Sequence, residues 1–305
     1  MSTLADVGRK MIQNKSGTIG YLLIIPSLII FAVFTFWPLL YTVYLSFFDW
    51  NMVSPTKEFV GLQNYINVLR DPRTYQILGN TLFYIVLLLL INFAVPYVFA
   101  FVVDVILKKF KGFYKSAMFL PAFISLVVGS ILFTWLLNPV SGPLAIIFGW
   151  FGIEIPNWTV SQGWIIVVLS LITSWKMFGY NFILLYASIN GISREVIESA
   201  RLDDIPLWRI FIQIVLPMSS ATGIYVFIMT IVQSLQFVFT PVKVVSQGGP
   251  DYGSSNLIYH AYHEAFVVYR TGHSATISII TMILFLILLF IEFKFVERRI
   301  YYENE

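Results

Sequence analysis

A lysine lies near the middle of a long apolar stretch of this sequence, where Lys176 is the one charged residue in 155–193. An ammonium group in a hydrocarbon environment costs about 2.5–3.5 kcal/mol on insertion scales, so it should face a cavity or a partner. Tyr180 and Asn181 follow four and five positions later, and the four-residue spacing puts Tyr180 on the helical face of Lys176. These side chains could bond substrate hydroxyls or an anionic group. The structural alternative for Lys176 is an interhelical bond or a snorkelling side chain.

Two amides in a second apolar stretch, Gln233 and Gln236, are three residues apart and share a helical face. Sugar sites combine amides with aromatic rings, but amides also hold membrane helices together by hydrogen bonds. Both interpretations stay open. The candidate substrate-pathway residues are therefore Lys176, Tyr180, Asn181, Gln233 and Gln236.

No other group of residues in the sequence indicates a catalytic or metal site. His260 and His263 are three residues apart and could share a helical face as metal ligands, but a third ligand is not evident. The sequence contains no cysteine, which excludes a thiol nucleophile, a disulfide framework and a cysteine-ligated metal. We therefore expect no catalytic residue, no metal site and no cofactor on this chain.

The composition indicates that the apolar stretches lie in a membrane. Hydrophobic residues make up 58% of the 305 residues and charged residues 11%, whereas an average soluble domain carries about 25% charged residues. A water-facing fold would have too little polar surface to cover such a core. A bilayer accepts apolar side chains on the outside, provided that each backbone polar group is bonded within the chain.

Uncharged runs long enough to cross a bilayer, about 20 residues, locate the spanning helices. The third run, 116–153, is too long for one span, and its end carries turn residues at 141–143. The first run is longer than the apolar core of a secretory signal, so an uncleaved first span is expected. The sequence predicts an all-α, polytopic integral membrane protein with one transmembrane domain over 1–305. Its six helices cover approximately 19–47, 79–106, 114–138, 161–190, 211–237 and 273–297.

Lysine and arginine predict the orientation of these helices. With six spans, one side of the membrane carries the N-terminal segment, the loops after the second and fourth spans and the C-terminal tail. Thirteen of the 19 basic residues fall there, five fall on the opposite side, and Lys176 lies within a span. The positive-inside rule therefore puts both termini and the loop between spans four and five in the cytoplasm.

The loop between spans four and five, residues 191–211, combines charge with apolar side chains. Ser193 suits the N-cap of a short amphipathic helix, and Pro206 suits the first turn of a second helix. The apolar side chains on this cytoplasmic loop are Leu202, Ile205, Leu207 and Trp208. An exposed apolar cluster rimmed by charge indicates a docking surface.

The spacing within this loop is similar to the coupling motif of ABC importer permeases: Glu-Ala-Ala, three residues, Gly, nine residues, then Ile-x-Leu-Pro. This chain has Glu198-Ser199-Ala200, three residues, Asp204, nine residues, then Ile214-Val-Leu-Pro217. It departs at two positions, where Ser199 replaces Ala and Asp204 replaces Gly. The corner between two helices often needs a left-handed residue, and Asp tolerates that conformation better than most residues do.

The resemblance extends over nearly the whole chain, to the permeases of the carbohydrate and glycerol-3-phosphate uptake family, such as those of the maltose and glycerol-3-phosphate type. Segments that resemble this family occur near each predicted span. They are Phe59-Val-Gly-Leu-Gln-Asn-Tyr65, Asn80-Thr-Leu82, Phe119-Leu-Pro121, Trp135-Leu-Leu-Asn-Pro139, Ser174-Trp-Lys176, Tyr180-Asn181, Gln247-Gly-Gly-Pro250, Leu257-Ile-Tyr259 and Glu264-Ala-Phe266.

This resemblance implies the fold of a type I ABC importer permease in a bacterial-type cytoplasmic (inner) membrane. It implies three kinds of partner besides lipid: a second, homologous permease, two ATPase subunits that each receive one coupling helix, and an extracytoplasmic solute-binding protein that delivers the solute. No nucleic acid is expected as a partner. ATP and Mg²⁺ would bind the ATPase subunits, because this chain lacks a Gly-x-x-x-x-Gly-Lys-Ser/Thr phosphate loop.

The resemblance also assigns roles within the coupling loop. Glu198 is expected to contact a basic group on the ATPase, while Ala200, Leu202 and Trp208 fill its groove. The full set of expected coupling residues is Glu198, Ser199, Ala200, Leu202, Asp204, Trp208 and Pro217.

The expected function is import of a sugar or oligosaccharide by alternating access. Glycerol-3-phosphate is the alternative within the same family, although a phosphate would favour several cationic donors and only Lys176 lies within the spans. An ion-coupled secondary transporter would need buried carboxylates, and no predicted span has a central Asp or Glu. A membrane enzyme would need a nucleophile motif or paired carboxylates, which the spans also lack.

Overall fold

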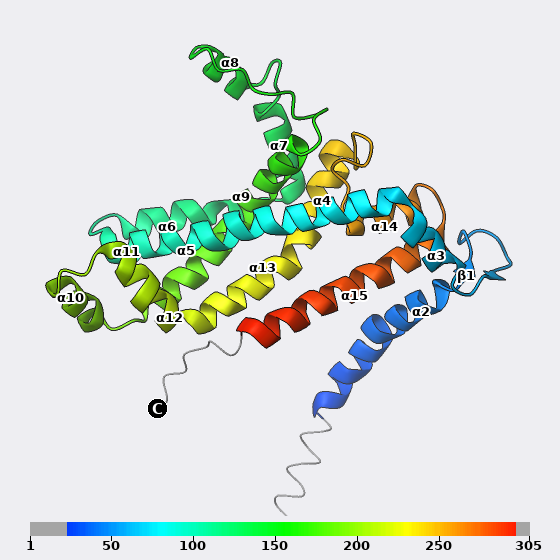
Figure 1. The fold of residues 1–305 in the computed structure, drawn as a ribbon, viewed down its shortest axis with the longest axis horizontal. Helices are drawn as coiled ribbons and strands as arrows, with labels where there is room; N and C mark the ends of the chain where they lie inside the picture. Colours follow the sequence, from blue (N-terminus) through cyan, green and yellow to red (C-terminus); the bar gives the residue numbers. More distant parts are fainter. Residues whose placement is uncertain (1–22, 297–305) are drawn as a thin grey trace, which may run out of the picture.

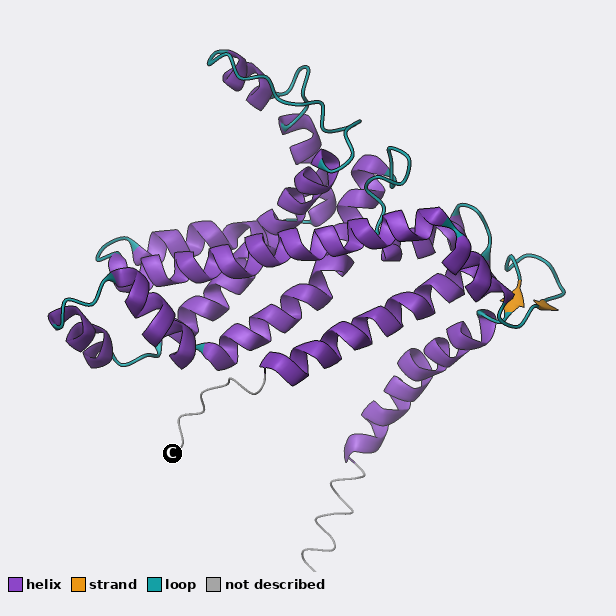
Figure 2. Cartoon of the chain, in the orientation of Figure 1, coloured by secondary structure: helices purple, strands orange, loops and turns teal. Residues whose placement is uncertain are grey.

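The computed structural model describes residues 23–296 of the chain. Within this range the chain is helical almost throughout, and its one sheet pairs two short antiparallel strands, β1 (Phe48–Asp49) and β2 (Glu58–Phe59) (Figure 2). Five of the described helices are long and apolar enough to cross a membrane, and a sharply bent helix pair makes up to six. The prediction of an all-α polytopic membrane protein with about six spans is confirmed.

The first described span, Leu23–Leu45, stands apart from the other helices for most of its length (Figure 1). It contains a π-helical turn, η1 (Ala32–Phe36), and ends as α2 (Trp37–Leu45). Its apolar window has no residue buried against the rest of the chain. Lipid or another subunit must therefore cover this helix. The predicted start of this span, residues 19–22, lies outside the described residues.

The second span, Pro72–Ile106, begins seven residues before its predicted start at 79. Its beginning is set by Asp71, whose side chain accepts a hydrogen bond from the backbone N–H of Arg73, and by Pro72 in the first turn. A short helix, α3 (Gln63–Arg70), precedes it. The span consists of α4 (Pro72–Leu89), η2 (Leu90–Ala94), α5 (Val95–Phe101) and η3 (Val102–Ile106).

The third span is broken in the middle, so the prediction of a single helix over 114–138 is wrong. Its two halves, Lys111–Phe123 and Leu126–Leu136, meet at 103°. Ile124 and Ser125 between them have extended ψ angles of 139° and 134°, which ends the first half and restarts the second. The elements are α6 (Lys111–Phe119), the 3₁₀ turn η4 (Leu120–Phe123) and α7 (Leu126–Leu136).

A short helix, α8 (Pro143–Gly149), follows α7 and projects away from the bundle (Figure 1). The fourth span, α9 (Trp164–Asn190), then crosses the centre of the molecule and contacts α4, α5, α6, α7 and α13. Gly179 on α9 lies so close to α6 that a Cβ atom there would clash with the Met118 carbonyl. This close approach fixes the middle of α9 beside the break in the third span.

The fifth span, Ser220–Ser246, begins nine residues after the predicted start at 211. A separate apolar helix, Leu207–Met218, precedes it, and Ser219 between them leaves helical geometry. The elements here are α11 (Leu207–Arg209), η5 (Ile210–Val215), α12 (Leu216–Met218), α13 (Ser220–Pro241) and η6 (Val242–Ser246). The remaining helices are α14 (Leu257–Phe266), outside the spans, and the last span α15 (Thr271–Val296).

Candidate functional site

The loop between the fourth and fifth spans forms a helix–turn–helix at one end of the bundle (Figure 1). Its first helix, α10 (Arg194–Leu202), has two different faces. Ile197 and Ala200 are buried, with 7% and 5% of their surface exposed, and pack into the chain's own core. Glu198 and Leu202, one turn apart, are exposed, Leu202 to 86%. The prediction that Ala200 fills a groove on a partner is therefore wrong, because its methyl group faces inward.

The corner after α10 is a Schellman motif centred on Asp204. Asp204 is left-handed, with φ of 54°, and its N–H donates to the carbonyl of Arg201 at 3.1 Å. The N–H of Ile205 donates to the carbonyl of Ala200, also at 3.1 Å. These two bonds satisfy the last carbonyls of α10 and turn the chain sharply. Asp204 thus occupies the conformation that glycine usually supplies at such a corner.

The second helix of the loop presents further exposed apolar surface. Trp208 is 59% exposed and Leu207 41% exposed, and the guanidinium of Arg209 lies 5.1 Å from the Trp208 ring centroid. We call Glu198, Leu202 and Trp208 the outer face of the loop. Ser199 and Pro217 are exposed as well. The outer face combines one acidic and two apolar side chains, the composition of a docking surface.

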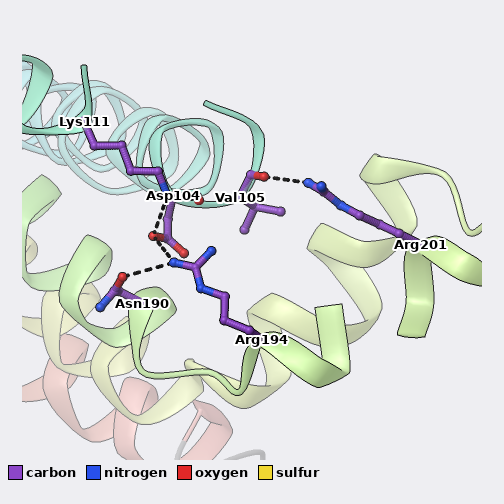
Figure 3. A network of polar contacts seen from close by, with 6 residues as sticks. All are labelled: Asp104, Val105, Lys111, Asn190, Arg194 and Arg201. Carbon is purple, nitrogen blue, oxygen red and sulfur yellow. Dashed lines mark hydrogen bonds and ion pairs between the residues drawn. The ribbon is translucent and has the colours of Figure 1, made fainter. Parts of the chain in front are cut away.

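A network of polar contacts ties α10 to the end of the second span (Figure 3). The buried carboxylate of Asp104 accepts from Lys111 at 3.4 Å and from Arg194 at 3.1 Å. Arg201 donates to the carbonyl of Val105 at 2.5 Å. The spacing of residues in the sequence does not predict this network. Its one signal was a carboxylate, Asp104, close to a cluster of basic residues.

Four of the five candidate pathway residues line one cavity of about 240 Å³ between α9, α13 and the break in the third span. They are Lys176, Tyr180, Asn181 and Gln233. The rest of the lining is apolar: Ala122, Met177 and Phe237. Small-molecule pockets commonly measure about 300–1,000 Å³, so this cavity is smaller than a complete site for a sugar.

Lys176 uses much of its hydrogen-bonding capacity on the chain itself. Its ammonium donates to the carbonyl of Ala122 at 2.8 Å and to that of Ile124 at 2.7 Å. Both carbonyls lie where the third span breaks and have lost their helical partners. The ammonium therefore caps the end of a half-helix, where a cation also complements the helix dipole. One of its three N–H donors is left for the cavity.

Asn181 is also bound within the chain. Its amide donates to the carbonyl of Asn92 at 2.6 Å and to Thr230 Oγ1 at 3.0 Å, and so joins spans two, four and five. Asn92 and Thr230 are buried, and the sequence analysis missed both. Pro96 in the sequence indicates that the Asn92 carbonyl needs another donor, because a proline four residues later has no N–H to donate to it.

Tyr180 and Gln233 are the polar residues of the cavity that have no hydrogen-bond partner within 23–296, and Tyr180 is 45% exposed. Gln236 is exposed but does not belong to the cavity lining. The cavity therefore contains one of the two candidate amides, Gln233. On α13, Gln233 lies in the same cavity lining as Asn181, and Gln236, three residues later, does not.

A buried carboxylate on α14, Glu264, lies close to two of the three histidines, His260 and His273. The Oε2 atom of Glu264 forms an ion pair with Arg270 at 2.6 Å and lies 3.3 Å from Nδ1 of His273. Burial raises the pKa of Glu264, but the hydrogen bond from His273 and the charge of Arg270 outweigh it, and the net pKa is lowered. Burial lowers the pKa of His260 to about 4, so its imidazole is neutral at pH 7. The cluster joins α14 to the start of α15, and no described group of three or more His, Asp or Glu side chains could hold a metal ion.

Comparison with protein families finds one match that covers more than half of the chain. Residues 108–302 match the family described as binding-protein-dependent transport system inner membrane component. This range includes the broken third span, the cavity-lining helices and the helix–turn–helix loop.

Similar proteins of known name extend the match to most of the chain. The sn-glycerol-3-phosphate transport system permease protein UgpA of Agrobacterium fabrum is 30% identical over 92% of this chain and 96% of its own length. The probable ABC transporter permease protein YurN of Bacillus subtilis is also 30% identical, over 92% of this chain and 97% of its own length.

The fold is similar to that of solved transporters. A chain of a bacterial ABC transporter involved in the import of the acidic polysaccharide alginate superposes with a TM-score of 0.80 at 20% identity, covering 95% of this chain and 99% of that chain. A second structure, of the alginate transporter with a pentasaccharide-bound periplasmic protein, gives a TM-score of 0.78.

Proposed function

The chain belongs to the family of binding-protein-dependent transport system inner membrane components, and from this premise we propose that it is one of two pore-forming permeases of an ATP-driven sugar importer. As a family member it is a transport component of the inner membrane and has the fold of an ABC importer permease. The outer face of the 191–211 loop would dock on an ATPase subunit.

The observation that carries this proposal is the exposure of the outer face. Leu202 is 86% exposed at the end of the bundle that carries the basic cytoplasmic loops, where water would not favour it. Glu198 lies one turn away and offers a carboxylate to a basic group. Since the chain lacks a phosphate-binding loop, ATP and Mg²⁺ would bind other subunits.

A second, homologous permease would complete the pore. The cavity of about 240 Å³ is smaller than a complete sugar site, as half of a shared site would be. The first span, whose apolar window is unburied, is free to pack on that partner. A solute-binding protein, which the family name requires, would deliver the solute on the opposite face from the outer face of the loop.

The cavity favours a neutral sugar or oligosaccharide. Its free polar groups are a phenol and an amide, Tyr180 and Gln233, which bond hydroxyls well. Glycerol-3-phosphate is the second candidate, because it appears in the name of a relative 30% identical to this chain. Against it, Lys176 is the one cation lining the cavity, and two of its donors are engaged by carbonyls.

Co-purification tests the docking role. We expect Leu202→Asp to remove the ATPase from the complex purified through a tag on this chain, while the partner permease stays bound. Val140, which is 87% exposed on the loop after the third span, is the matched control. If Val140→Asp lost the ATPase equally, or Leu202→Asp kept it, the outer face would not be the docking surface.

Thermal stabilisation of the solute-binding protein that works with this permease tests the substrate. A panel of mono- and oligosaccharides is compared with glycerol-3-phosphate at equal concentration. Stabilisation by glycerol-3-phosphate alone would replace the sugar proposal by the second candidate.

A further inference from the structure

The buried carboxylate of Asp104 lies where the second span ends and where three separate elements meet (Figure 3). It is 3% exposed and accepts from Lys111, at the start of α6, and from Arg194, at the start of α10. A buried carboxylate requires such partners, because an unpaired charge at this depth is strongly unfavourable. Asp104 therefore connects the second span, the third span and the 191–211 loop.

Two arginines attach α10 at both of its ends. Arg194 and Arg201 are seven residues apart, two helical turns, so they project from the same face of α10. Arg194 reaches the Asp104 carboxylate, and Arg201 reaches the Val105 carbonyl. Between them on this inner face lies the buried side chain of Ile197. The inner face is thus fixed to the second span, and the outer face is left for a partner.

The same contacts complete the end of the second span. Lys111 donates to the carbonyl of Asp104 at 2.6 Å, as Arg201 does to that of Val105. Both carbonyls belong to the last turn of the helix and have no further helical N–H to accept from. Cations at a helix C-terminus also complement its dipole. Without these side chains, the last turn of the second span would have unsatisfied carbonyls, and α10 would be held by its two flanking turns and the apolar packing of Ile197 and Ala200.

We infer that Asp104, Lys111, Arg194 and Arg201 form a clamp that makes α10 and the cytoplasmic ends of the second and third spans move as one body. This inference rests on the proposed function, in which the ATPase acts on the outer face of α10. A push on the outer face then reaches the second and third spans directly through the clamp, as well as the fourth and fifth spans through the backbone. The four residues position α10 and do not contact solute or nucleotide.

Distance measurement between two spin labels tests the clamp in the intact chain. The sequence has no cysteine, so Lys109→Cys and Glu195→Cys place labels at two exposed positions, beside the end of the second span and on α10. We expect a narrow distribution in the wild-type background. Arg194→Gln should shift it to longer distances and broaden it, and Arg194→Lys, which keeps the charge, should restore most of it.

A second variant and a control separate the clamp from loss of folding. Asp104→Asn is expected to broaden the distribution as Arg194→Gln does, while Glu154→Gln, in the loop after α8, leaves it unchanged. An unchanged distribution in both Arg194→Gln and Asp104→Asn would overturn the inference. Arg194 is half exposed, so its replacement leaves the core intact.

The same labels test transmission in the complete complex with its ATPase subunits. With the non-hydrolysable nucleotide AMP-PNP added, we expect the distance between positions 109 and 195 to stay constant in the wild type and to change in Arg194→Gln. A wild-type distance that changes with nucleotide would overturn the rigid clamp. Absence of any ATPase from the purified wild-type complex would instead refute the proposed function, and the nucleotide-free comparison is independent of that result.

Discussion

The 191–211 loop and the intramembrane cavity use polar residues in opposite ways. In the 191–211 loop, the polar and apolar side chains of the outer face are exposed, and the backbone and the inner face hold the helix in place. In the cavity, Lys176 and Asn181 give their hydrogen bonds to carbonyls of the chain itself. The groups left for a solute are Tyr180 and Gln233.

The difference follows from the two solvents. At the cytoplasmic end water satisfies any polar group, so an exposed apolar side chain such as Leu202 is the informative feature. Within the bilayer there is no water to satisfy a backbone carbonyl freed by a break or a proline. A polar side chain there, such as Lys176, first serves the carbonyls beside it. Only the hydrogen-bonding capacity that remains after these carbonyls are satisfied is open to a solute.

The largest effect should come from the outer face of the coupling loop. We expect Glu198→Lys to abolish ATP-dependent uptake while the protein still inserts, because it places a cation where a basic ATPase group is expected. Uptake by membrane vesicles and the amount of protein in the membrane are measured together. Glu154→Lys, the same change in the exposed loop after α8, is the control. Normal uptake by Glu198→Lys would mean that the outer face of the loop does not act as a docking surface for an ATPase.

Within the cavity, Lys176→Met should reduce both stability and uptake. It leaves the carbonyls of Ala122 and Ile124 unsatisfied, and each such group costs about 1–3 kcal/mol. Tyr180→Phe removes a hydroxyl without a partner in the described chain, so it should lower uptake and leave the melting temperature in detergent unchanged. A Lys176→Met variant with wild-type melting and impaired uptake would make Lys176 a solute-binding residue instead.

A smaller loss is expected at the interhelical amide. Asn181→Leu removes the bond to the Asn92 carbonyl, and hydrogen bonds between membrane helices average about 0.6 kcal/mol, with a maximum of about 1.7. Gln236→Leu, at an exposed position of α13, should change the melting temperature by less than this. Equal destabilisation by both variants would mean that Asn181 holds the helices no more strongly than an exposed residue does.

The sequence predicted the spans and the coupling loop better than the cavity, for a physical reason. Hydropathy and the spacing from Glu198 to Pro217 are local properties of the chain, and so is the left-handed corner at Asp204. The break in the third span at Ile124 is not visible in the pattern of charges, because residues 116–136 on both sides of it carry none. The partners of Lys176 and Asn181 come from other spans, 49 to 89 residues away along the chain. The spacing of residues within one span contains no information about such distant partners.

The smallest effect should come from the corner at Asp204, where the sequence departs from the family pattern. Asp204 has a left-handed backbone conformation, which costs an ordinary residue about 1–2 kcal/mol, and Asp204→Gly removes this cost. Glycine in turn loses more backbone entropy on folding, which costs about 0.5–1 kcal/mol. We therefore expect a change in stability within about 1 kcal/mol and unchanged uptake. Asp203→Gly, at a neighbouring right-handed position with φ of −80°, has no strain to relieve and should only destabilise. If Asp204→Gly lowered uptake as far as Glu198→Lys does, the Asp204 carboxylate would belong to the docking surface and the outer face would extend around the corner.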